Sequence, residues 1–440
     1  MLDNQPIERL ILPFQRFASQ EASGGILLLI CTLIALIWSN IDLQSYEKIW
    51  ETHLSIGLQD FMLDKSLHFW VNDALMAIFF FVVGLEIKRS LIAGELASVK
   101  QASLPVMAAI GGMLVPAGLY IAVNFGTEGV RGWGIPMATD IAFSLGILAL
   151  LGSRAPLSLK VFLTAFAIVD DIGAVFVIAL FYTESIAWMY VSLGGAILIA
   201  LTLLNILGVR NIYIFLGLGI IVWISFMQSG IHSTVAGVAV AATIPLNVRL
   251  DLQQFVIKIK GLISQFERQG DTGSRVLTTP HQKEILEELE RASKDVESPL
   301  QRLEHSIHPW VAFGIMPLFA LANAGVVLDS RLTQIIFEPV AFGIILGLIV
   351  GKPVGIFLFT WLSIRLGIGR MAEDIGWLHI VGVSLLGGVG FTMSLFIADL
   401  AFISPEYSNQ AKTAILLASL VVGLSGYLLI KLFNSNINRS

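Results

Sequence analysis

Charged residues and cysteines are scarce in this sequence. Asp, Glu, Lys and Arg make up 13% of its 440 residues, about half of the roughly 25% that is usual in soluble domains. The single cysteine, Cys31, lies in an apolar run, which excludes a disulfide framework and a zinc site built from cysteines. We also expect no signal peptide, because no small-residue cleavage site follows the apolar run Ile26–Trp38. That run is predicted to be a first membrane span.

Apolar residues are abundant and are arranged in long runs. They make up 56% of the chain, and runs of about 18 to 25 residues can cross a hydrocarbon core of about 30 Å. Helices satisfy their own backbone polar groups in lipid, and the short alternating segments of a transmembrane β-barrel are not seen. The sequence therefore predicts an all-α polytopic membrane protein, with a single integral-membrane transporter domain over residues 1–440.

About twelve transmembrane helices account for these runs. Most Lys and Arg residues fall on the side of the two termini, as the positive-inside rule requires of a cytoplasmic face. We therefore expect an even number of spans and both termini in the cytoplasm. The predicted spans are 23–39, 67–87, 102–123, 133–151, 157–182, 187–206, 211–228, 230–246, 308–327, 335–362, 376–400 and 410–432.

Two polar segments interrupt the spans. Residues 40–66 are expected to face the periplasm and to contain a short hairpin. Residues 247–307 are expected to form a cytoplasmic loop. Within this loop Gln282–His305 is acidic and has Leu and Ile at helical spacing, which predicts one amphipathic helix. The simplest interpretation of that helix is a solvated element with no role in transport.

Charged residues inside the predicted spans are few, and each is a functional candidate because a charge at the bilayer centre costs on the order of 3 kcal/mol. Asp170 and Asp171 lie in the middle of span 157–182. Adjacent helical residues point about 100° apart, so we expect one to face a water-filled cavity and the other a cationic partner. Hard cations prefer oxygen ligands, and two nearby carboxylates repel each other when both are ionised. Such a pair can hold either a cation or protons, as exchange requires.

Two spans are predicted to break inside the membrane. In one, Pro136 removes a backbone donor shortly before Asp140, and in the other three glycines fall within Gly387–Gly390. Paired broken helices are typical of an ion site built from inverted repeats, and their dipole ends need compensating charge. Asp140 suits the positive ends and Lys352 the negative ends. Lys352 also needs a carboxylate, for which either of the two adjacent acids is available.

Several other titratable residues leave two interpretations open. His232, at the start of a span, is either a hydrogen-bonded structural residue or a pH sensor. Asp73, near the outer end of a span, either caps a helix or acts in transport. A group at the cytoplasmic side is either solvated charge or a pH-responsive network. This group contains Glu86, Lys88, Arg89, Glu304, His305 and His308.

Eight motifs, taken in order, resemble those of the bacterial NhaA-type Na⁺/H⁺ antiporters. The resemblance extends over nearly the whole chain except about 250–298, and the ordered set is far more specific than any one motif. The motifs are FFFVVGLEIKR (79–89), ATDIAF (138–143), AFAIVDDIGA (165–174), SGIHSTVAG (229–237), RLEHSIHPW (302–310), FALANAG (319–325), GKPVGI (351–356) and GVGFTMSLFI (388–397).

This resemblance implies a fold of twelve helices, with two discontinuous helices that cross and with alternating access to the site. It implies that Asp171 and Asp170 carry the cation and the protons, with Asp171 the stronger ligand. By the same comparison Asp170 pairs with Lys352, and Asp140 and Thr139 lie at the crossing. The substrates would be Na⁺ or Li⁺ and H⁺, with no resident cofactor and no nucleic-acid partner.

The resemblance also implies regulation, assembly and location. Electrogenic exchange in the bacterial inner membrane would move more protons inward than sodium outward. The hairpin in residues 40–66 would join a homodimer, and Glu86 and Glu304 would belong to pH control. With the neighbouring titratable groups, the candidate residues for pH regulation are Glu86, Arg89, His232, Glu304 and His308.

Three other functions fit the sequence less well. A channel needs an open polar path, which Lys352 would block to cations. An intramembrane aspartyl protease, the enzyme alternative, usually carries Gly-x-Gly-Asp, and the sequence has no such tetrapeptide. A sodium-coupled solute symporter is the nearest alternative, but the spans hold no added Arg or aromatic cluster for an organic substrate. We therefore expect a secondary active transporter.

Overall fold

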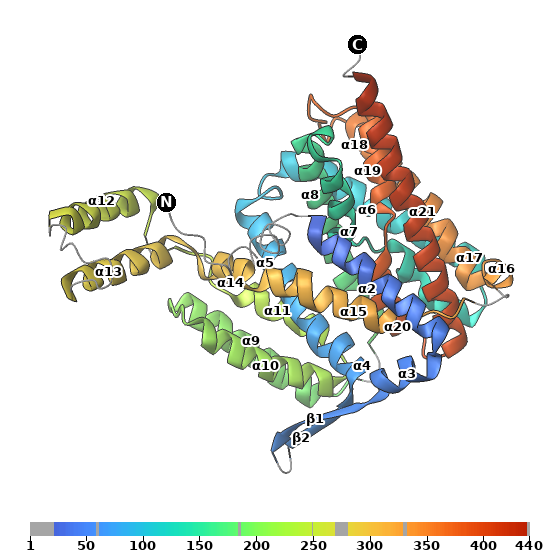
Figure 1. Ribbon diagram of the computed structural model, residues 1–440, viewed down its shortest axis with the longest axis horizontal. Helices are drawn as coiled ribbons and strands as arrows, with labels where there is room; N and C mark the ends of the chain where they lie inside the picture. The colour runs from blue at the N-terminus through green and yellow to red at the C-terminus, as the bar shows by residue number, and fades with distance from the viewer. Residues whose placement is uncertain are drawn as a thin grey trace, which may run out of the picture.

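The computed structural model describes residues 22–58, 61–183, 186–248, 250–268, 280–328 and 332–437, and this part of the chain is almost entirely helical (Figure 1). The α-helices are α2 (Ala22–Ile41), α3 (Leu43–Glu51), α4 (Leu67–Phe69), α5 (Met76–Ala93), α6 (Val99–Asn124), α7 (Ile141–Leu150), α8 (Leu157–Phe181), α9 (Trp188–Ile206), α10 (Ile212–Ser229), α11 (Thr234–Thr243), α12 (Leu252–Arg268), α13 (Pro280–Val296), α14 (Pro299–Trp310), α15 (Met316–Asn323), α16 (Leu332–Ile335), α17 (Pro339–Leu346), α18 (Lys352–Arg365), α19 (Trp377–Gly387), α20 (Phe391–Ala401) and α21 (Pro405–Ile437). The π-helical turns are η1 (Trp70–Leu75), η4 (Val311–Ile315) and η5 (Gly347–Gly351), and the 3₁₀ segments are η2 (Glu128–Met137) and η3 (Gly152–Arg154).

The predicted all-α polytopic membrane fold is confirmed. Within the described ranges nine helical segments are long and apolar enough to cross a membrane, and α19 with α20, bent by 40° at their break, makes a tenth. The other two predicted spans correspond to shorter or more charged helices. Span 67–87 overlaps α5, which runs on to Ala93 and carries Glu86, Lys88 and Arg89. Span 230–246 contains α11, which is only 10 residues long. The count of twelve therefore stays a prediction.

A two-stranded sheet projects from the helical body, at the bottom of Figure 1. Strands β1 (His53–Leu58) and β2 (Phe61–Ser66) pair antiparallel, with His53 opposite Ser66. The Ser55 hydroxyl donates to Asp64 Oδ1 across the strands at 2.7 Å. This bond, together with His53, holds the pKa of Asp64 below its usual value. Helix α4 follows β2 directly, so the hairpin marks one end of the helical body.

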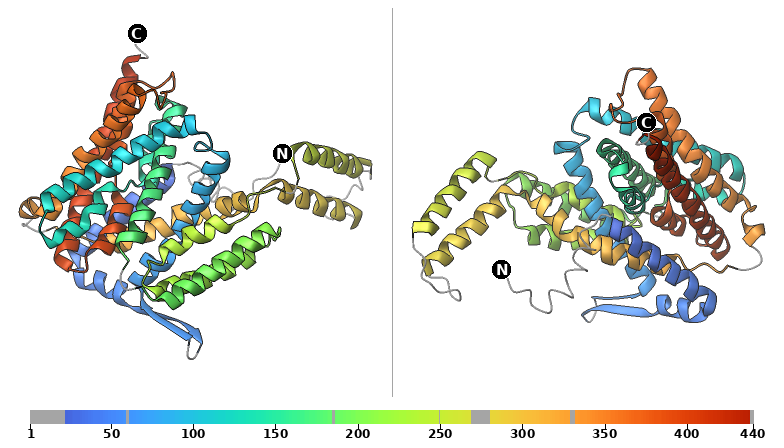
Figure 2. Two further views of the ribbon diagram at one scale, coloured as in Figure 1. Left: turned by 180° about the vertical axis from the view of Figure 1, so that it is seen from behind. Right: turned by 45° about the horizontal axis from the view of Figure 1, so that its top comes forward.

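The prediction of one amphipathic helix over Gln282–His305 is wrong. The structure has two helices there, because α13 ends at Val296 and α14 begins at Pro299. Ser298 forms a capping box with Gln301: its hydroxyl accepts the Gln301 N–H at 3.1 Å, and the Gln301 side chain accepts the Ser298 N–H at 3.3 Å. Helix α13 packs against α12, a helix that was not predicted from the sequence. Figure 2 shows this pair extending away from the helical body.

Glycines allow α6 and α18 to approach closely. A Cβ atom at Gly111 would lie 2.3 Å from the carbonyl oxygen of Gly355, and one at Gly355 would lie 2.2 Å from the carbonyl oxygen of Gly111. Both distances are far shorter than a van der Waals contact, so neither position has room for a side chain. Helix α18 begins at Lys352. Backbone contact between the two helices therefore fixes where this buried lysine lies.

We predict that Gly111→Ala lowers the melting temperature of the detergent-solubilised protein, because overpacking of a tight contact costs about 1 to 3 kcal/mol. The matched control is Gly118→Ala in the same helix, where a Cβ atom meets nothing within 4 Å. That control should melt at or above the wild-type temperature, since alanine favours a helix over glycine. Equal melting temperatures for the two variants would contradict the proposed role of the contact.

Candidate functional site

The buried charges of the described residues gather around two chain breaks. The charged side chains that are buried there are Asp140, Asp170, Asp171 and Lys352, with exposed fractions of 2% or less. One break lies between η2 and α7, where residues 138–140 are extended, and the other lies between α19 and α20 at residues 388–390. The predicted interruptions at Pro136 and at the glycines of Gly387–Gly390 therefore coincide with real ends of helices.

The two breaks contact each other directly. The Asp140 N–H donates to the carbonyl of Val389 at 2.7 Å, and the hydroxyl of Thr139 donates to the carbonyl of Gly387 at 2.7 Å. In the opposite direction, the Ser394 hydroxyl donates to the Ile135 carbonyl at 2.7 Å. Each interrupted segment thus satisfies backbone groups that the other leaves without a helical partner.

The Asp140 carboxylate caps two helices at once. Its Oδ1 accepts the N–H of Phe143 at 2.9 Å in the first turn of α7. Its Oδ2 accepts the N–H of Thr392 at 3.1 Å and also the Thr392 hydroxyl in the first turn of α20. A helix N-terminus carries partial positive charge, so a single carboxylate compensates two of them. This role agrees with the charge compensation expected from the sequence.

Lys352 compensates the opposite end of a helical segment. Its Nζ donates to the carbonyl of Met137, the last residue of η2, and to Asp170 Oδ2 at 2.8 Å. The face of the Phe166 ring lies 6.0 Å from the same ammonium group. Both side chains of the ion pair are fully buried. Of the two adjacent acids that were available, the structure pairs the lysine with Asp170.

Asp171 is the neighbouring acid without such a partner. It is 2% exposed, and its Oδ1 has no hydrogen-bond donor in the described part of the chain. Asp170 Oδ1 is likewise buried without a donor. Two carboxylate oxygens on successive residues are therefore left without a partner, and an unpaired buried anion is costly. A bound proton or a small cation would remove that cost, so the pair can exchange one for the other.

The candidate pH-regulation residues do not form one cluster. Arg89 on α5 forms an ion pair with Glu304 on α14, with 2.7 Å between Nη1 and Oε1. His308 follows one turn after Glu304 on the same helix, and Glu86 lies one turn before Arg89 on α5. These four residues therefore lie around the contact between α5 and α14. His232 is separate from them.

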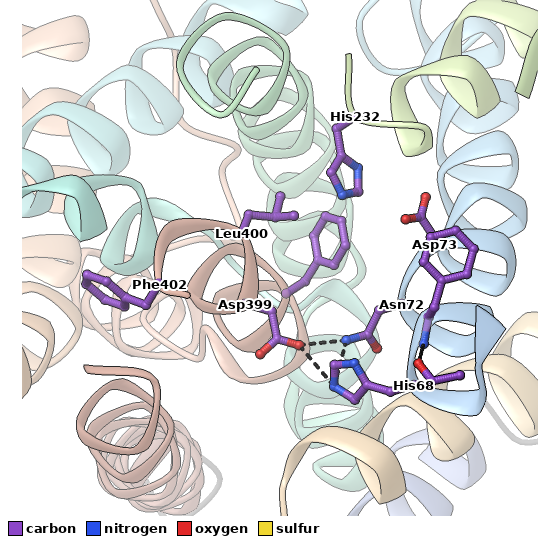
Figure 3. Close-up of a pocket in the computed structure, with 10 residues that line it drawn as sticks. His68, Asn72, Asp73, His232, Asp399, Leu400 and Phe402 are labelled. Carbon is purple, nitrogen blue, oxygen red and sulfur yellow. Dashed lines mark hydrogen bonds and ion pairs between the residues drawn. The ribbon is translucent and has the colours of Figure 1, made fainter. Parts of the chain in front are cut away.

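His232 lies beside an open cavity of about 340 Å³ near the end of the hairpin. Its Nδ1 is 2.7 Å from the Thr234 hydroxyl, and its ring meets that of Phe396 edge-on, with 5.4 Å between centroids. Asp73 faces the same cavity, as Figure 3 shows. Asp73 does not cap a helix N-terminus, because it lies inside the π-helical turn η1.

Several polar residues around this cavity were not among the candidates predicted from the sequence. Asp399, at the end of a predicted span, has the position of an ordinary solvated carboxylate, yet Asn72 Nδ2 donates to it at 2.6 Å. Asn72 also exchanges hydrogen bonds with Asn323 at 3.1 and 2.7 Å. The available signal was the occurrence of Asn72 and Asn323 within apolar spans, where unpaired amides are costly.

Comparison with known proteins gives full-length matches. The model of the family described as Na⁺/H⁺ antiporter 1 matches residues 15–430. A protein of Oleidesulfovibrio alaskensis named Na(+)/H(+) antiporter NhaA is 49% identical over 430 residues, which cover 97% of this chain and 95% of the relative. Proteins named Na(+)/H(+) antiporter NhaA 1 are 46% identical in Saccharophagus degradans (96% and 91% covered) and 48% identical in Psychromonas ingrahamii (93% and 94% covered).

We predict that Lys352→Ala lowers the melting temperature strongly, because it leaves the buried Asp170 carboxylate unpaired, and the loss of one partner of a buried pair costs about 3 to 5 kcal/mol. The double variant Lys352→Ala/Asp170→Asn should recover part of this loss, since it removes the unpaired charge. Lys431→Ala, at an exposed lysine, is the control. A single variant as stable as the control would show that the ion pair does not hold this region together.

Proposed function

This chain belongs to the Na⁺/H⁺ antiporter 1 family, and we propose from that premise that Asp171, with Asp170, forms the site at which a cation and protons compete. The chain is therefore a multi-pass membrane transporter that exchanges Na⁺ for H⁺, and the comparisons give no support to a sodium-coupled solute symporter. The observation that carries the site assignment is the buried Asp171 Oδ1 without a donor, next to the Asp170–Lys352 pair.

The same contacts support a stoichiometry for the proposed exchange. A cation that binds both carboxylates competes with the Lys352 ammonium for Asp170. Without its partner the buried ammonium is favoured to lose its proton, because burial disfavours an unpaired charge. One proton then leaves Asp171 and a second leaves Lys352 for each Na⁺ or Li⁺ bound. This supports the proposal that exchange is electrogenic, with more protons moving inward than sodium outward.

Location and assembly complete the proposal. Most Lys and Arg residues lie on the side of the termini, which supports a bacterial inner-membrane protein with both termini in the cytoplasm. The hairpin then faces the periplasm. Leu54, Ile56 and Met62 on its strands are exposed, which supports a homodimer that covers them. The transported ions are the only small ligands in this proposal, and no resident cofactor is needed.

We predict that Asp171→Asn abolishes cation-dependent collapse of a proton gradient in everted membrane vesicles, because a neutral amide can neither release a proton nor bind Na⁺ as an anion. NaCl and LiCl should collapse the gradient in wild-type vesicles, and KCl should not. Asp374→Asn is the matched control, since Asp374 is exposed and accepts a hydrogen bond from Ser158 at 2.5 Å. Full exchange by Asp171→Asn would remove the assignment, and a wild type with no response to either salt would count against antiport itself.

Regulation by pH is proposed to act through the contact between α5 and α14. The ion pair Arg89–Glu304 joins the two helices, and Asp73 lies in the π-helical turn η1, which leads directly into α5. Lys88, next to Arg89, donates to the carbonyls of Ala242 and Ile244 at 2.6 Å, at the C-terminal end of α11. A change of protonation in this region therefore acts on several helices near the site.

We predict that Glu304→Gln moves the pH of half-maximal activity downward by about half a unit, the effect of an ion pair worth somewhat less than 1 kcal/mol. Loss of the carboxylate leaves Arg89 unpaired, and the added positive potential makes neighbouring groups release protons at lower pH. The measurement is the rate of Na⁺-dependent exchange against pH. Arg302→Gln, a change of charge on the same helix without that pair, tests for a general surface effect. An unchanged profile would exclude the pair from pH control.

A further inference from the structure

The cavity near the hairpin is bordered by a polar network that the proposed exchange site does not use. The network centres on Asp399, on α20, whose side chain is only 15% exposed. Lys412 Nζ on α21 lies 3.1 Å from Oδ1, while Asn72 Nδ2 and His68 Nε2 lie 2.6 and 3.6 Å from Oδ2. Figure 3 shows His68 and Asn72 converging on this carboxylate. Asp399 therefore joins α20 to three other elements, namely α4, η1 and α21.

Helix α20 also reaches the crossing of the two breaks. Thr392, in its first turn, binds the Asp140 carboxylate. Asp399 follows seven residues later, which places it on the same side of the helix and about 10 Å further along. The same short helix therefore bonds to the ion-site region at one end and to the polar network at the other.

Phe396 fills the space between these two ends of α20. Its ring is fully buried and lies 5.4 Å from that of Phe80 and 6.3 Å from that of Phe319. On the cavity side it meets His232. Along α20, Phe396 lies between Thr392, which binds Asp140, and Asp399, which borders the cavity. The aromatic cluster is therefore placed to bar the way from the cavity to the crossing as long as α20 stays where it is.

We propose that Asp399 is a latch that holds α20 in place and closes the hairpin side of the transport path. In this arrangement its bonds to Asn72 and Lys412 hold α20, and with it the aromatic cluster, between the cavity and the crossing. Opening toward the hairpin side requires α20 to leave these partners, after which the carboxylate faces a wider, water-filled cavity. Asp399 is a positioning residue in this proposal, since it acts through the position of α20 and does not touch the ion site.

This proposal rests on the antiport function proposed above, because it needs a site that opens to each side in turn. It predicts an asymmetry that a purely structural brace would not produce. A weakened latch shifts the population toward the state open on the hairpin side. The apparent affinity of a ligand scales with the fraction of protein in the competent state. Affinity for Na⁺ should therefore rise at the hairpin face and fall at the opposite face.

The experiment measures the apparent KM for Na⁺ from each face of the membrane, in right-side-out and everted vesicles with the full-length protein. For Asp399→Asn we expect the KM at the hairpin face to fall and the KM at the opposite face to rise, each by about fivefold. Asp374→Asn is the control at an exposed carboxyl and should change neither constant. A brace without a gating role would lower the melting temperature or the maximal rate and leave the ratio of the two constants unchanged.

A second variant keeps the test decisive if Asp399→Asn does not fold. Lys412→Met removes the other half of the ion pair and should shift both constants in the same directions. If Asp399→Asn does fold, the double variant should do no more than the larger single variant, because partners in one interaction are not additive. Constants that stay fixed, or move together at both faces, would overturn the latch and leave antiport standing. Loss of Na⁺ exchange in the wild type would overturn both.

Discussion

The contact between the two interrupted helices is the constraint on which the rest of the structure depends. A break in a helix inside a membrane exposes backbone groups that lipid cannot satisfy, at a cost of several kcal/mol for each group. Here the breaks lie about 250 residues apart in the sequence, and each supplies the donors that the other lacks, as in the bond from Thr139 to the Gly387 carbonyl. Neither break could persist without the other, so the pair must form together.

The placement of charge follows from this contact. Asp140 is satisfied by two helix N-termini, and Lys352 by a segment's carbonyl end and by Asp170. These bonds occupy the hydrogen-bond donors near the crossing, and Asp171 Oδ1 is left without a donor. A site that exchanges a cation for protons needs a buried carboxylate that has no permanent partner. In the proposed function, the fold thus produces the site by satisfying every neighbouring charge except that of Asp171.

Much of this arrangement could be predicted from the sequence, because a charge or a helix breaker in an apolar run has few explanations. Pro136, the adjacent acids and Lys352 were recognised on that ground. Which acid pairs with Lys352 depends on helix rotation, which periodicity alone does not fix. The resemblance to the NhaA-type antiporters implied Asp170, and the structure confirms that pair. Asp399 was missed because a carboxylate at the end of a span is normally solvated, and its partners come from elements far away in the chain. The division between α13 and α14 had a readable signal in Ser298-Pro299.

A polar latch suits a gate that must open to water. Apolar side chains that part at an opening gate expose surface at a cost of about 25 cal/mol for each Å². A carboxylate, an amide and an ammonium instead exchange their mutual bonds for bonds to water, so the closed and open states differ by a smaller free energy. Asp399 and Phe396 both line the cavity, but Phe396 is fully buried and lies three residues closer along α20 to Thr392 at the crossing. The polar layer thus lets α20 move at low cost, while the apolar layer keeps ions from passing when it has not moved.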